Sequence, residues 1–131
     1  MKEMILTNKA PKPVGPYSQG IKAGDFLFVA GQVPIDPQTG QIKGQSIEEQ
    51  TKITLQNVQA ILEAGGASLA QVVKVTVVLS DMANFERFNA VYKTYFPASP
   101  PARICYGGSL LGGGKLLVEI DAIAYMGPGS D

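Results

Sequence analysis

The spacing of apolar and polar positions changes several times along the chain, and each spacing predicts one kind of element. Residues 25–31 form a nearly continuous apolar run, which is typical of a central strand. Residues 72–79 are rich in β-branched side chains, and residues 102–107 and 116–125 also have the character of strands. Residues 10–20 contain three prolines and two glycines, which predicts a loop.

Two segments have helical spacing instead. The first begins at Ser46, which has capping-box spacing to Glu49, and ends at the glycine pair 65–66. The second covers residues 82–96 and stops before Pro97, because proline cannot continue a helix. Both carry an apolar stripe, formed by Leu55, Val58, Ile61 and Leu62 in the first and by Phe85, Phe88, Val91, Tyr92 and Tyr95 in the second.

This order predicts an α+β fold, in which two helices pack on one face of a mixed sheet. A chain of 131 residues is most simply one domain, residues 1–131. Two helices can cover only one face of such a sheet, so an apolar outer face would need a partner. The pattern therefore predicts self-association.

The amino-acid composition limits the kinds of functional site that the chain can form. The 11 basic and 11 acidic residues balance, which gives no support to nucleic-acid binding. With no histidine and one cysteine, Cys105, the common zinc, copper and iron sites and an intrachain disulfide are excluded. We see no ligand loop for magnesium or calcium and expect no metal and no cofactor. The N-terminus shows no signal core and no apolar run has the length of a membrane span, so we expect a cytoplasmic protein.

Two charged residues stand inside predicted strands. Arg103 offers a planar fork of donors that fits a carboxylate, and Glu119 can orient water or move protons. Alternation places Arg103 and Cys105 on one face of their strand, and Glu119 and Asp121 on one face of theirs. If the last two strands form a hairpin, Arg103 and Glu119 approach each other across it. On spacing alone, a structural ion pair at a subunit contact is slightly favoured over an active site.

Other candidates have ordinary explanations as well. Cys105 lacks the neighbouring histidine that a nucleophilic cysteine usually has, and a buried cysteine more often acts as a small hydrophobe. Tyr17 can point its hydroxyl into a cleft or simply pack in its loop. Asn89 can cap the second helix or contact a neighbouring strand. Gly31 is expected where the backbone needs close approach or unusual dihedrals.

Four segments together resemble the RidA family, also called the YjgF or endoribonuclease L-PSP family. They are residues 14–19, 30–40, 101–105 and 118–124, and they follow one order with close spacing over nearly the whole chain. The resemblance implies a chorismate-mutase-like fold and a homotrimer with clefts between its subunits. It also implies hydrolysis of reactive enamines and imines, such as 2-aminoacrylate, to 2-keto acids and ammonia, without a cofactor.

The resemblance also implies roles for single residues. Arg103 matches the arginine that grips the substrate carboxylate, and Glu119 matches the glutamate associated with the hydrolytic water. Cys105 matches the cysteine whose backbone meets the imine nitrogen. Tyr17 matches the cleft tyrosine, and the remaining substrate-binding matches are Gly31, Asn89 and, at a position where many active relatives have serine, Ala30.

Two departures keep other functions open. Ala30 removes one hydroxyl from the expected pocket, and residues 107–114 are rich in glycine where relatives have a different strand and turn. A trimer that binds 2-keto acids without turnover, or acts like a chaperone, is therefore one alternative. An endoribonuclease is another, although zero net charge and the absence of histidine argue against it.

Overall fold

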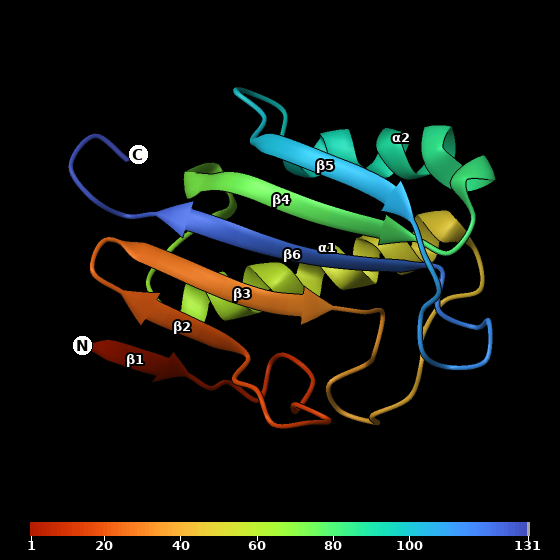
Figure 1. Cartoon of the computed structure of the whole chain (residues 1–131), viewed down its shortest axis with the longest axis horizontal. Helices are drawn as coiled ribbons and strands as arrows, with labels where there is room; N and C mark the ends of the chain where they lie inside the picture. Colours follow the sequence, from red (N-terminus) through yellow and green to blue (C-terminus); the bar gives the residue numbers. More distant parts are fainter. Residues whose placement is uncertain (131) are drawn as a thin grey trace.

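The computed structural model describes residues 1–130 and contains a six-stranded sheet with two α-helices behind one of its faces (Figure 1). The predicted α+β fold with both helices on one face is thus confirmed. The helices are α1 (Ile47–Ala64) and α2 (Phe85–Tyr95), with short 3₁₀ turns η1 (Leu69–Gln71) and η2 (Met82–Asn84). The strands are β1 (Lys2–Ile5), β2 (Gly20–Ala23), β3 (Phe26–Gln32), β4 (Val72–Leu79), β5 (Ala102–Gly107) and β6 (Val118–Tyr125).

The strands lie in the order β1-β2-β3-β6-β4-β5. All neighbours are antiparallel except β4 and β5, which run parallel because α2 carries the chain back between them. Strand β3 has neighbours on both sides, as its apolar run predicts. The hairpin expected between the last two strands is wrong, because β4 lies between β5 and β6.

Local sequence signals explain the two helices. Ser46 and Glu49 form the predicted capping box at the start of α1, and Gly65 follows its last turn. The second helix starts later than expected, because residues 82–84 form a 3₁₀ turn whose preceding Asp81 accepts a hydrogen bond from the backbone of Ala83. Across residues 1–130, no helix is both long and apolar enough to cross a membrane.

The helices cover one face of the sheet and leave the other face exposed. Valines of β4 and β6, among them Val75, Val77 and Val118, are fully buried beneath the helices. On the opposite face, Phe28 is 43% exposed, Ile104 51% and Tyr106 48%. Aromatic and branched side chains therefore form an open, largely apolar surface, which Figure 1 shows free of helices.

Candidate functional site

Arg103 lies on the face of β5 that the helices cover. It pairs in register with the buried Val75 of β4, so its side chain points toward α2. There the guanidinium Nη1 donates a 2.8 Å hydrogen bond to Oδ1 of Asn89. The guanidinium carbon lies 4.8 Å from the ring centre of Tyr92 and 5.7 Å from those of Phe85 and Phe88. These contacts fix the plane of the cation by cation–π attraction and one hydrogen bond.

The arginine has no acidic partner in the described part of the chain, where the ion pairs involve Lys43 and Arg87 instead. Asn89 takes up only one of its donors, so a planar fork remains for an external anion. The aromatic cradle around it was not predicted as part of a site. Its signal was the spacing of Phe85, Phe88 and Tyr92 along one side of α2, opposite a charged strand residue.

Two groups beside Arg103 have altered acidity. Burial raises the pKa of the Cys105 thiol, and the positive charge of Arg103 only partly opposes this. The thiol therefore stays protonated at neutral pH and is a poor nucleophile. Burial also raises the pKa of Tyr92, whose hydroxyl is enclosed and has no hydrogen-bond partner among residues 1–130.

Glu119 lies on the opposite, open face. Its register places it in one row with Val78 of β4 and Tyr106 of β5. Burial raises the pKa of the Glu119 carboxyl, and the negative charge of Asp121 two residues on raises it further. Asp121 itself accepts a 3.0 Å hydrogen bond from the backbone of Thr76. Glu119 thus combines partial burial, a carboxyl that holds its proton more tightly than usual and access to a cavity, which suits proton transfer.

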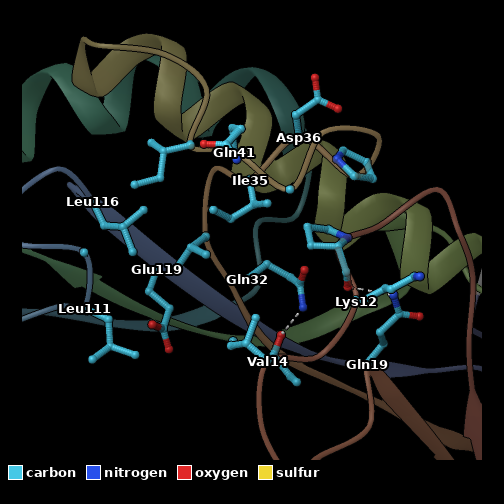
Figure 2. A pocket seen from close by; sticks show the side chains of 18 of the residues that line it. Lys12, Val14, Gln19, Gln32, Ile35, Asp36, Gln41, Leu111, Leu116 and Glu119 are labelled. Atoms are coloured by element: carbon cyan, nitrogen blue, oxygen red, sulfur yellow. Dashed lines mark hydrogen bonds between the residues drawn. The ribbon is translucent and has the colours of Figure 1, made fainter.

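The cavity beside Glu119 has a volume of about 950 Å³. Loops at the end of the sheet enclose it, and Figure 2 shows the Glu119 side chain extending into this space. Its lining includes three other predicted positions, Tyr17, Ala30 and Gly31. A Cβ added to Gly31 would collide with Oε2 of Glu119, so glycine serves close approach at this position. The Tyr17 hydroxyl accepts a 3.2 Å hydrogen bond from the backbone of Val14.

The predicted residues therefore fall into two groups within one chain. Arg103, Cys105 and Asn89 lie on the helix side of the sheet, whereas Glu119 and its pocket lie on the other side and at the sheet's end. The expected approach of Arg103 to Glu119 across a hairpin is wrong, since β4 separates their strands. They also form no ion pair with each other.

Three buried amide side chains hold the loops around the cavity, and sequence reasoning missed all three. Gln19 binds the backbone of Thr7, Ala10 and Pro11 at 2.7–3.2 Å. On α1, Asn57 donates to the carbonyls of residues 33 and 35, at 3.0 and 2.9 Å. One further amide, Gln50, fixes the segment that leads into β6. Buried amides in an otherwise apolar pattern were the available signal, because such groups need partners.

Among residues 1–130, no group of three or more His, Cys, Asp and Glu side chains is placed to hold a metal ion.

Known proteins resemble this chain closely. The family model described as Endoribonuclease L-PSP matches residues 7–126. A RutC family protein from Pyrococcus horikoshii is 57% identical over 95% of this chain and 98% of its own length. A mouse protein named 2-iminobutanoate/2-iminopropanoate deaminase is 43% identical over 98% of this chain and 94% of its own. The crystal structure of Escherichia coli TdcF with bound serine is 38% identical, covers 95% of this chain and 99% of that one, and has a TM-score of 0.89.

Proposed function

The chain belongs to the endoribonuclease L-PSP family, also known as the RidA or YjgF family, and from this premise we propose that it is an imine deaminase. Its substrates would be reactive 2-imino acids of the 2-aminoacrylate and 2-iminobutanoate class, and its products 2-keto acids and ammonia. Similar proteins named as deaminases of such imines support this reaction class.

The arrangement around Arg103 is the observation that carries the proposal. A guanidinium held by three aromatic rings and one amide oxygen, with no acidic partner in residues 1–130, is built to receive a carboxylate from outside. Every 2-imino acid has one. Clamping that carboxylate fixes the neighbouring imine carbon, which supplies much of the orientation that the reaction needs.

Glu119 would act on the water. The carboxylate takes a proton as the water oxygen adds to the electrophilic imine carbon, and it returns the proton as the carbon–nitrogen bond breaks. The balanced reaction is R–C(=NH)–COO⁻ + H₂O → R–C(=O)–COO⁻ + NH₃. No covalent nucleophile is needed, which agrees with the protonated thiol of Cys105. The backbone carbonyl of Cys105 would accept a hydrogen bond from the imine N–H, and Tyr17, Ala30 and Gly31 would line the cleft with Glu119.

The two groups of residues would meet between subunits. In one chain they lie on different sides of the sheet, so a complete site needs Arg103 of one subunit beside Glu119 of its neighbour. The open apolar face, with Phe28, Ile104 and Tyr106 partly exposed, supports burial against other copies. We propose a homotrimer with three such clefts, as in the family that the sequence resembles.

The proposal is tested by coupling a serine or threonine dehydratase to the purified protein and following decay of the imine signal. Wild type should accelerate the decay, and Arg103→Ala should not. Arg87→Ala is the matched control, because the chain's other arginine binds Glu48 at the surface. If the folded wild-type protein binds a 2-keto acid but leaves the imine untouched, a non-catalytic binding protein becomes the better account. Cleavage of RNA that disappears in Arg103→Ala would instead support a ribonuclease.

A further inference from the structure

In the single chain the cavity beside Glu119 is large, and the neighbouring subunit of the proposed trimer would cover part of it. Its volume of about 950 Å³ lies near the upper end of pockets that enclose drug-sized ligands. The residues that line the cavity near Glu119 therefore decide which substrate side chain fits.

One wall of the cavity is apolar, and the glycine-rich segment noted in the sequence contributes to it. The segment between β5 and β6 contributes Leu111, Gly112 and Leu116 to the lining, and the loop before α1 contributes Ile35 and Ile42. Figure 2 shows Leu111 and Leu116 on the same side of the cavity as Glu119, with the charged Lys12 and Asp36 across from them. Leu111, Leu116, Ile35 and Ile42 themselves offer a substrate side chain only apolar contacts.

The wall is held in place by packing. Gly112 has φ +95°, and a Cβ there would lie 3.2 Å from Cγ of Leu116 and 3.6 Å from Cδ1 of Ile42. A side chain at position 112 would therefore crowd Leu116 and Ile42, and glycine leaves room for them. Leu116 is 6% exposed, and Gln50 holds both of its neighbours, accepting from Leu117 N and donating to the carbonyl of Lys115 at 2.8 Å each.

Leu111 completes this wall at its rim. The side chain is 82% exposed, although it belongs to the lining of the cavity. Exposure of a leucine side chain to water is unfavourable. A bound apolar group would cover this side chain and recover part of that free energy. It can also be replaced without disturbing the core, which makes it a clean probe.

We propose that this wall, formed by Ile42, Leu111 and Leu116, is a subsite for the substrate's side chain, and that it favours imino acids with branched aliphatic side chains such as the one derived from leucine. The inference rests on the proposed function. The trigonal imine carbon carries three groups, of which the carboxylate goes to Arg103 and the nitrogen to the Cys105 carbonyl. Because the water would be held at Glu119, on the same side of the cavity as Leu111 and Leu116, the remaining substituent would lie within reach of this wall.

The test compares imines that differ only in side chain. An L-amino acid oxidase forms them from alanine, 2-aminobutyrate and leucine, and semicarbazide traps whatever imine the protein has not hydrolysed. Wild type should act on the leucine-derived imine with a kcat/KM about tenfold or more above that for the alanine-derived imine. Leu111→Ala should reduce this ratio about fourfold, the value of one methylene-sized contact. Leu6→Ala, an exposed leucine outside the cavity lining, should leave the ratio unchanged.

The outcomes separate the two claims. Turnover of the alanine-derived imine at a rate equal to or above the leucine-derived one would overturn the subsite while leaving the deaminase proposal standing. A Leu111→Ala variant that slows both imines by the same factor would also overturn it. If no imine is hydrolysed by the folded protein, the proposed function fails and the subsite fails with it.

Discussion

The shape of the Arg103 side chain matters as much as its charge, because three rings and one amide oxygen contact its guanidinium plane. Lysine at this position keeps the charge but loses the planar fork and the stacking. We expect Arg103→Lys to lower kcat/KM for imine hydrolysis about 100-fold, the usual effect of misplacing a substrate by about 1 Å. Steady-state kinetics in the dehydratase-coupled assay would measure this.

The second arginine provides the comparison. Arg87 binds Glu48 through Nε and Nη2 at 2.9 and 2.7 Å on the exposed surface, where ion pairs contribute little. Arg87→Lys should therefore retain wild-type kinetics. Near-native turnover by Arg103→Lys would remove the carboxylate-clamp role from this residue.

Because of Glu119, activity and stability should depend on pH in opposite ways. As pH rises, activity should increase and the stabilisation from this residue should decrease. Burial and Asp121 raise its pKa above the ordinary value of 4.5, so the folded protein binds this proton more tightly than the unfolded chain does. The resulting stabilisation is complete below pH 4.5 and is lost as pH rises through the raised pKa. Catalysis instead needs the ionised carboxylate, so kcat/KM should fall as pH drops through that same raised pKa.

Glu119→Gln separates these effects. The neutral amide should abolish the acid limb of the activity profile along with most of the activity. It should also raise the free energy of unfolding at neutral pH relative to wild type, and this gain should vanish below the ordinary pKa of 4.5. Chemical denaturation at several pH values and one fixed protomer concentration would measure it. A variant less stable than wild type at neutral pH would show that ionised Glu119 is favourably paired in the assembly.

At the scale of elements, local pattern predicted what each segment is, and long-range pairing decided where it lies. The apolar run at residues 25–31 and the capping box at Ser46 depend on neighbours in sequence, and both expectations are confirmed. The pairing of β5 was misassigned because the short 108–117 segment suggested a hairpin with β6. A helix between β4 and β5 permits parallel pairing instead, and the sheet adopts it.

Local sequence pattern was limited in the same way for the candidate site: it identified the residues but not their positions in the fold. Arg103 and Glu119 could be singled out because charges in strands stand out in a sequence. Their placement on opposite faces depends on which strand lies between them, which no local spacing records. The role of Gln50 was equally hidden, since two of its hydrogen-bond partners, Lys115 and Leu117, are more than 60 residues away.

Gln50 shows how one side chain on α1 can support the start of β6. It is 2% exposed, accepts from Leu117 N, and donates to the carbonyls of Lys115 and Gly44. Gln50→Leu keeps the volume but leaves these backbone groups unpaired, so we expect a loss of about 3 kcal/mol in the free energy of unfolding. Denaturant unfolding would measure it.

The same helix offers a control for this change. Gln59→Leu removes a single surface hydrogen bond, to Glu63, and should change the free energy of unfolding by less than about 0.5 kcal/mol. Equal stability of the two variants would mean that the start of β6 is held by packing alone.

On the scale of the whole molecule, one chain carries two incomplete halves of the proposed site. Arg103 lies under α2 and Glu119 faces the loop-enclosed cavity, with β4 between their strands. The uncovered face adds a second reason for assembly, because its aromatic and branched side chains are partly exposed in the single chain. Both features are accounted for if the clefts form between subunits.

Mixing two inactive variants tests this arrangement directly. Arg103→Ala and Glu119→Gln should each be inactive alone, yet a cleft that takes its arginine from a Glu119→Gln subunit and its glutamate from an Arg103→Ala subunit contains both native side chains. Random assembly from equal amounts gives each choice a probability of one half, so about one quarter of the clefts should be complete. Co-refolded mixtures should therefore regain about 25% of wild-type activity, whereas variants refolded separately and then combined should regain it only as fast as subunits exchange. As a control, wild type is co-refolded with a variant that carries both Arg103→Ala and Glu119→Gln. The activity of this mixture shows whether mixed trimers assemble with intact clefts. If the mixture stays inactive while the trimer forms, Arg103 and Glu119 do not act in one cleft, and the site must be sought within the single chain.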